Sequence, residues 1–298
     1  HPGYRMNLAA SIRIAVGLPM IDVLEELLRK IRPYEKEEGS ADAAFEKAMD
    51  LLIDGMEKGG VRGARKGFRQ AIEVMKAVAY DRGRPKPQVL IVGEYLLNFH
   101  PGANHDIEVY LEKNGFEVIE ARMTGVIRKI YFNKDSQVKE YHIHRPLREK
   151  LWNRLANKVF DIAHDLTDRI AKGHPLYERA CRLPELVKRS DPVIPHTFDA
   201  GEGVLIPGEI LHHAAHGCRA FVILQPFGCL PNHVIGRGIV KKLKEYYPDA
   251  QILPLDYDPD VSFANLENRL QMLVMNVIEK ERLEQQREKQ SDESKGIA

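Results

Sequence analysis

The sequence has little that would suit a membrane protein, a disulfide-rich secreted protein or a nucleic-acid-binding protein. Its 298 residues include three cysteines, Cys181, Cys218 and Cys229, which are too few for a disulfide framework. The formal net charge is +1, so no overall field attracts DNA or an anionic membrane. No apolar run approaches the ~20 residues of a membrane span, and the initial "HPGYRMNLAAS" lacks the features of a signal peptide. These absences predict a globular, cytoplasmic protein with no nucleic-acid or membrane partner.

Familiar nucleotide and zinc motifs are also missing. There is no Walker A lysine motif, and "GRG" at residues 236–238 lacks the dinucleotide pattern, so we assign it to close helix–sheet packing. His212 and His216 are spaced as zinc ligands on a helix can be, but Glu209 precedes the histidines and no His-Glu-x-x-His results. We therefore expect His212, His213 and His216 to lie on a solvated helix face without a metal.

Hydrophobic periodicity divides the chain into five regions. Residues 1–85 are predicted to be helical, because "MIDVLEELLRKI" and "ADAAFEKAMDLLIDGMEKGG" place apolar residues three and four apart, the latter ending at Gly59-Gly60. The other regions are a first α/β unit (86–145), a long helix with a proline-broken crossing (146–199), a second α/β unit (200–283) and a frayed polar tail (284–298).

Short continuous apolar runs such as "QVLIVG" and "AFVILQ" are typical of strands buried in a parallel sheet. We expect parallel strands at about 88–93, 116–121, 220–225 and 250–255. "IYF" and "YHIH" are candidates for a further strand. The predicted fold class is α/β, with two Rossmann-like parallel-sheet units and an N-terminal helical region.

The segment "QPFGCLPNH" places Cys229 between two prolines, just beyond a predicted strand. Ligands of open α/β sheets bind at this edge, and a thiolate at a helix start is a better nucleophile and metal ligand. Pro226 and Gly228 would shape a sharp turn, and Pro231 would start the next helix. The alternative is an inert packing cysteine, because free cysteine is among the most buried residue types.

Polar residues also follow the first predicted strand, in "EYLLNFHPGANHD". If the two units face each other, this loop and the cysteine loop border one cleft. Alternatively, Asn104 or Asp106 merely caps the following helix. The residues expected to line the cleft are Glu94, Asn98, His100, Asn104 and His105, with Asn232 and His233 from the cysteine loop.

"VILQPFGCLPNHVIGRGIVKKLKEYYPDAQILPLDYDP" and "VGEYLLNFHPGANHDIEVYLEKNGFEVIEA" resemble the C-terminal region of large, fused 2-hydroxyacyl-CoA dehydratase activase-related proteins. These regions are similar to subunits of the 2-hydroxyglutaryl-CoA dehydratase and benzoyl-CoA reductase type. The resemblance spans roughly residues 5–283, and "QPFGCLPNH" is its most specific part. It implies Rossmann-like domains and anaerobic metabolism.

The resemblance further implies a [4Fe-4S] or double-cubane cluster with Cys229 as a ligand, and an acyl-CoA substrate. The implied partner is an ATPase activase portion or subunit in a homo- or hetero-oligomer. Two departures stand out. Members of the family usually supply about three cysteines per cluster, whereas here only Cys229 matches a motif, and the ATPase portion has no counterpart in this sequence.

Three functions remain open from the sequence. The first is an iron–sulfur-associated, dehydratase-type domain in radical acyl-CoA dehydration or low-potential electron transfer. The second is a cluster-free scaffold that docks an activase or dehydratase partner. The third is a hydrolase or transferase with Cys229 as nucleophile and His233 as base, although the sequence offers no third orienting group.

Overall fold

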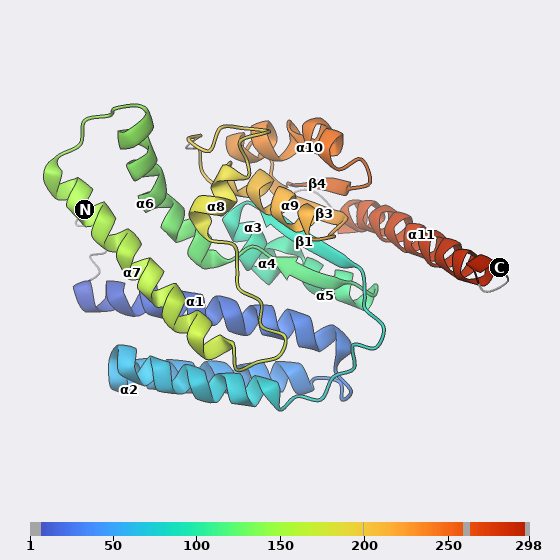
Figure 1. Cartoon of the computed structure of the whole chain (residues 1–298), viewed down its shortest axis with the longest axis horizontal. Coiled ribbons are helices and arrows are strands. Elements are labelled where there is room, and N and C mark those ends of the chain that lie inside the picture. Colours follow the sequence, from blue (N-terminus) through green and yellow to red (C-terminus); the bar gives the residue numbers. More distant parts are fainter. Residues whose placement is uncertain (1–6, 199, 259–262, 296–298) are drawn as a thin grey trace. The chain divides into compact units, whose positions relative to one another are not determined.

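The computed structural model describes residues 7–198, 200–258 and 263–295, and it divides the chain into two compact units (Figure 1). Unit 1 comprises residues 1–85 and 120–199, and unit 2 comprises residues 86–119 and 200–298. Each unit therefore combines segments that are far apart in the sequence.

Unit 1 is helical in its described residues. Met20, Leu24 and Leu27 of the first helix are almost fully buried against its neighbours, as the spacing of the apolar residues predicts. The helices are α1 (Leu8–Ile31), η1 (Arg32–Tyr34), α2 (Ser40–Lys76), α6 (Met123–Glu140), α7 (Leu147–Ala171) and α8 (Leu183–Lys188).

The element α2 is a helical hairpin, drawn as two adjacent coils in Figure 1. Gly60 has φ 55° and ψ −139°, which breaks the helix where the Gly59-Gly60 pair predicts a stop. The two arms approach closely through glycines: a Cβ on Gly55 would lie 2.5 Å from the carbonyl oxygen of Gly63, and a Cβ on Gly63 would overlap the carbonyl oxygen of Gly55. Glycine at these two positions is therefore a packing requirement.

Helix α6 replaces the further strand for which "IYF" and "YHIH" were candidates. Residues 130–132 lie inside α6, and residues 141–144 connect α6 to α7. The buried carboxylate of Asp22 on α1 accepts hydrogen bonds from the backbone amides of Met123 (3.1 Å) and Thr124 (3.0 Å). It thus caps the start of α6 from another helix, a long-range contact that local sequence patterns do not reveal.

Unit 2 contains one parallel sheet of four strands in the order β2-β1-β3-β4. The strands are β1 (Gln88–Gly93), β2 (Glu117–Glu120), β3 (Ala220–Pro226) and β4 (Gln251–Tyr257). All four expected strands are thus confirmed, as is the α/β class. The two separate Rossmann-like units are not confirmed. Because β1 pairs directly with β3, the strands expected in two units form one sheet.

Helices cover the sheet of unit 2. On one face, buried side chains of α5 and α11, including Ile107, Leu111 and Leu270, pack on Val89, Val222 and other strand residues. Helix α9 contacts β1, and η2 contacts both β3 and α9. These helices are α3 (Tyr95–Phe99), α4 (Pro101–Asn104), α5 (Ile107–Lys113), α9 (Leu205–Ala215), η2 (Asn232–Arg237), α10 (Val240–Tyr246) and α11 (Phe263–Lys295).

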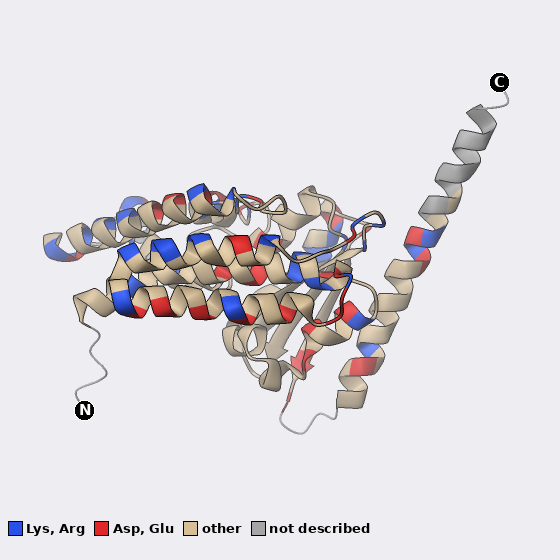
Figure 2. Cartoon of the chain, turned by 90° about the horizontal axis from the view of Figure 1, so that it is seen from below, with Lys and Arg blue, Asp and Glu red and all other residues tan. Residues whose placement is uncertain are grey.

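The polar tail expected over residues 284–298 belongs to α11 as far as Lys295, and residues 296–298 lie outside the described part. Figure 2 shows Lys and Arg mixed with Asp and Glu along the helices, in keeping with the net charge of +1.

Alanine at Gly63 should destabilise the protein. The added methyl would force the α2 arms apart, and such overpacking costs about 1–3 kcal/mol of unfolding free energy. Gly59→Ala is the matched control, because a Cβ there has no neighbour within 4 Å. It should leave stability unchanged or raise it by up to about 1 kcal/mol. Urea denaturation measures both, and equal effects of the two variants would refute the close-packing argument.

Asp22 should make stability fall as pH rises. Burial raises its pKa from 3.8 to about 6, against the smaller lowering by the Thr124 hydrogen bonds and Arg122. Because the folded state favours the neutral form, the contribution is fully present below about pH 4 and is lost as pH rises through about 6. The difference in unfolding free energy between Asp22→Asn and the wild type should therefore shift in favour of the variant by roughly 2–3 kcal/mol as pH rises from about 4 to about 7. Denaturant titrations at several pH values give this difference, which would stay constant if Asp22 did not titrate.

Candidate functional site

The strand order of unit 2 creates a topological switch point between β1 and β3. From β1 the chain continues to β2 on one side, whereas β3 and β4 lie on the other side. Ligands of open α/β sheets bind in the crevice at the carboxyl ends of the strands flanking such a point. Gly93 is the register partner of Leu224, and the Glu94 amide donates to the Leu224 carbonyl oxygen (2.9 Å). The loops that follow β1 and β3 therefore begin at one edge, as the sequence predicts.

The cysteine loop turns sharply immediately after β3. Gly228 has φ 79°, the left-handed region that favours glycine, and the amide of Cys229 donates to the carbonyl oxygen of Pro226 (3.1 Å). Pro231 has helical φ and ψ and directly precedes η2. The turn that the two prolines and the glycine predict is thus present, and it leaves Cys229 half-buried rather than in the core.

The helix that follows the cysteine differs from the one expected, because residues 232–237 form a π-helix. The Gly238 amide donates to the carbonyl oxygen of His233 (3.2 Å), five residues earlier. A Cβ on Gly236 would lie 3.0 Å from the side chain of Ile223 on β3, which bears out the packing role assigned to "GRG". Single-turn π-helices occur frequently at functional sites.

A buried polar group surrounds the sulfur of Cys229. The side-chain amide of Asn232 donates to Cys229 Sγ (3.2 Å) and also to Oε1 of Glu202, which lies 3.9 Å from the same sulfur. Asn232 is fully buried and Glu202 nearly so. A buried carboxylate needs such a donor to offset its desolvation. We expected backbone amides of the next helix to stabilise the thiolate, but the donor that the structure shows is a side chain.

Two buried side-chain amides at this edge, that of Asn232 and that of Gln225, carry unpartnered acceptors. Asn232 Oδ1 and Gln225 Oε1 accept no hydrogen bond from the described residues. Both oxygens are within 4 Å of the position that a Cβ on Gly236 would occupy, so they face the same space. The amide of Gln225 donates to Oδ1 of Asp256. Since an unsatisfied buried acceptor costs about 1–3 kcal/mol, this pair favours a ligand or solvent molecule that donates hydrogen bonds.

The first loop contributes Glu94 and Tyr95 to this edge. The carboxylate of Glu94 accepts from the amide of Leu97 (3.1 Å) and so caps α3. Burial, followed by the negative charges of Glu202 and Glu94, raises the pKa of Tyr95 above its ordinary value. Tyr95 and Glu202 were not expected from the sequence. The one signal for Glu202 is its position in "GEG", shortly before α9.

Three of the other residues of the first loop, His100, Asn104 and His105, have structural roles. His100 accepts from the amide of Ala103 (3.2 Å) and caps α4. Asn104 donates to the carbonyl oxygen of Leu97 (2.8 Å). Its Oδ1 accepts weakly from the amide of Ile107 (3.4 Å) at the start of α5, as the capping alternative predicts. His105 stacks on Tyr257, with ring centroids 6.1 Å apart. Asn98 is buried, and its Oδ1 has no partner among the described residues.

The two ring nitrogens of His233 are not placed to accept a proton from the sulfur of Cys229. Its Nδ1 lies 3.0 Å from the backbone oxygen of Cys229, and its Nε2 lies 3.7 Å from Oδ1 of Asp256. In the described part of the chain, the sulfur contacts Asn232 and Glu202 and forms no hydrogen bond with His233. This geometry does not support the nucleophile–base pair.

The remaining cysteines and the histidine cluster lie elsewhere. Cys218 is buried, its sulfur donates to the carbonyl oxygen of Ala220 (3.3 Å), and burial raises its pKa to about 11. Cys181 belongs to unit 1. On α9, the rings of His212 and His216 are 4.5 Å apart; His216 is exposed, whereas His212 and His213 are half-buried rather than fully solvated.

A complete iron–sulfur cluster does not fit the ligands of this chain alone. Such clusters require several thiolates, and Cys229 is the one thiol at the switch point among the described residues. Over the described ranges, no group of three or more His, Cys, Asp or Glu side chains is arranged to hold a metal ion. The site therefore offers one soft ligand in a polar setting, not a ligand set.

Comparisons with protein-family models, with curated proteins and with solved structures found no match for this chain. Within residues 7–198, 200–258 and 263–295, no helix has the length and apolar character needed to cross a membrane.

The charge of Glu202 should slow alkylation of Cys229. Glu202→Gln removes a negative charge 3.9 Å from the sulfur while keeping an acceptor for Asn232, so iodoacetamide should modify Cys229 about threefold to tenfold faster. Glu209→Gln on α9 is the matched control and should not change the rate. Peptide mass spectrometry follows each thiol, and Cys218 should remain unmodified in the native protein. An unchanged rate in Glu202→Gln would mean that the carboxylate does not act on the thiol.

Proposed function

We propose that this chain is the thiolate-presenting, dehydratase-type component of an iron–sulfur assembly, acting in radical acyl-CoA dehydration or low-potential electron transfer. Cys229 supplies one ligand, and a partner polypeptide supplies the others. The observation that carries the proposal is the half-buried sulfur of Cys229, held at the switch point of a parallel sheet by a buried amide. A packing cysteine would not need this polar setting.

The residues around the sulfur have distinct parts in this proposal. Asn232 donates to the sulfur, an interaction that tunes the potential of thiolate-bound clusters. Glu202 holds the Asn232 amide in place from the segment before α9. Tyr95 begins α3 at the same edge, directly after Glu94, and is the residue of the first loop that we assign to contact the substrate. When bound, an iron–sulfur cluster supplies single electrons at low potential.

Exposed apolar side chains next to Cys229 support a partner polypeptide. Phe227 is 73% exposed and Leu230 is 68% exposed, and both lie within two residues of the cysteine. Val234 is half-exposed one helical turn further on. Large apolar side chains clustered around a functional residue are typical of a protein-binding surface. The resemblance of "QPFGCLPNH" to dehydratase-related proteins makes an ATPase activase the expected partner.

The same surface favours one alternative function, a cluster-free scaffold that docks an activase or a dehydratase. Both functions require the apolar side chains at Phe227 and Leu230, but only the first requires the sulfur of Cys229. Iron content therefore separates them.

The proposal predicts iron and acid-labile sulfide in the assembly, dependent on Cys229. Tagged chain is isolated anaerobically from its source cells as wild type, as Cys229→Ser and as Cys181→Ser, the matched control on unit 1. Wild type and Cys181→Ser should carry the same iron and sulfide, whereas Cys229→Ser should lose most of both. Phe227→Ser should lose the partner together with the iron.

Two results would count against the proposal. A partner that co-purifies with an iron-free chain would establish the scaffold function instead. Iron retained in full by Cys229→Ser would leave the cysteine without a ligand role.

A further inference from the structure

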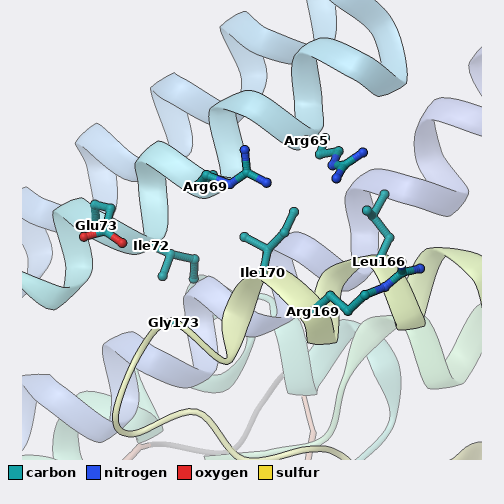
Figure 3. A pocket seen from close by; sticks show the side chains of 8 residues that line it. All are labelled: Arg65, Arg69, Ile72, Glu73, Leu166, Arg169, Ile170 and Gly173. Carbon is teal, nitrogen blue, oxygen red and sulfur yellow. The ribbon is translucent and has the colours of Figure 1, made fainter.

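A cavity in unit 1 lies between the second arm of α2 and the end of α7 (Figure 3). Its volume is about 270 Å³. The lining residues are Arg65, Arg69, Ile72, Glu73, Leu166, Arg169, Ile170 and Gly173. Both helices belong to one compact unit, so the wall on each side is fixed by the helical core.

Three arginines line this cavity. Arg65 and Arg69 are one helical turn apart on α2, so both lie on the same face. Arg169 on α7 donates Nε to the carbonyl oxygen of Asp165 (3.0 Å), four residues earlier on the same helix, and also lines the cavity. In the described part of the chain, Arg65 and Arg69 have no hydrogen-bond or ion-pair partner.

This arrangement favours an anion in the cavity. Like charges one turn apart on a helix repel, and Arg169 adds a third positive charge from the opposite wall. Two other arginines of unit 1, Arg122 and Arg182, do pair with carboxylates. Guanidinium groups with free donors match phosphate oxygens in geometry as well as in charge.

The rest of the lining defines the other end of the ligand. Ile72 and Ile170 supply an apolar wall beyond the arginines, and Figure 3 shows Glu73 at the end opposite Arg65 and Arg169. An apolar wall accepts a hydrocarbon or aromatic group. The carboxylate of Glu73 repels a second anionic group there, so the ligand carries its negative charge at one end.

The volume limits the size of the ligand. Pockets for drug-sized molecules or whole cofactors range from about 300 to 1,000 Å³, and this cavity lies below that range. It therefore suits a single phosphate with a small organic group rather than an enclosed dinucleotide.

We propose that the cavity between α2 and α7 binds a small organic phosphate monoester. The phosphate accepts hydrogen bonds from Arg65, Arg69 and Arg169, and the organic group packs on Ile72 and Ile170. This site is independent of Cys229, which belongs to unit 2.

Phenyl phosphate is the probe, and isothermal titration calorimetry of the full chain is the measurement. Phenyl phosphate should bind more tightly than inorganic phosphate, because the ring buries apolar surface, and more tightly than benzoate, because the phosphate carries more charge. Affinity should fall as salt is added. Adenosine monophosphate is included to distinguish a free small phosphate from the phosphate end of a larger molecule. Binding of either one supports the site, and the tighter ligand identifies the source.

Gln substitutions locate the binding site. Arg65→Gln, Arg69→Gln and Arg169→Gln should each weaken binding by about fivefold to twentyfold. Arg62→Gln is the matched control: Arg62 is an exposed arginine on α2 that does not line the cavity, and its loss should change affinity by less than about twofold. Thermal unfolding of each variant verifies that the fold is intact. We expect an intact fold, because all four arginine side chains are exposed.

The proposal is overturned if phenyl phosphate and adenosine monophosphate both fail to bind at millimolar concentration. It is also overturned if binding survives all three Gln substitutions in the cavity, or if Arg62→Gln weakens it as much as they do.

Discussion

The pairing of β1 with β3 is the constraint on which the candidate site depends. Residues 89–93 and 220–224 are far apart in the sequence, yet they run parallel in a continuous register. Because parallel strands present their carboxyl ends at one edge, this register brings Glu94 and Cys229 to the same side of the sheet. The β1–β3 pair also separates β2 from β4 and so creates the switch point. Without this pairing, the loop after β1 and the loop after β3 would follow strands of two separate sheets.

A second constraint is electrostatic. Glu202, Asn232 and Gln225 are buried at the edge where Cys229 lies, although burial of polar groups opposes folding. The Asn232 amide is shared between a carboxylate and a thiol, so its orientation is fixed by two acceptors at once. Networks of this kind lock side-chain positions when satisfied. The unpartnered oxygens of Asn232 and Gln225 show that satisfaction is incomplete among the described residues, which is typical of a site rather than of a core.

Local signals in the sequence sufficed for the strands, the glycine break in α2 and the turn at Gly228, because each depends on residues close together in the chain. The single sheet could not be predicted in this way, since apolar strand patterns specify burial and not the neighbouring strand. Glu202 was missed for the same reason: it lies 27 residues before Cys229, and only the fold brings them together. The opposite error affected His100 and Asn104: the side chain of His100 caps α4, and that of Asn104 contacts the backbone of α3 and α5. Polar residues after a strand thus predict an edge, but not which of them face the ligand.

The two sites proposed for this chain differ in the charge that each tolerates. At Cys229, a buried carboxylate lies 3.9 Å from the sulfur and opposes the binding of an anion such as phosphate. A phosphate would gain little there, because the donors nearest the sulfur already serve Glu202. In the cavity of unit 1 the balance is reversed, with three guanidinium groups and one carboxylate in the lining. Each unit thus has its own charge environment at the site proposed for it, although the chain as a whole is nearly neutral.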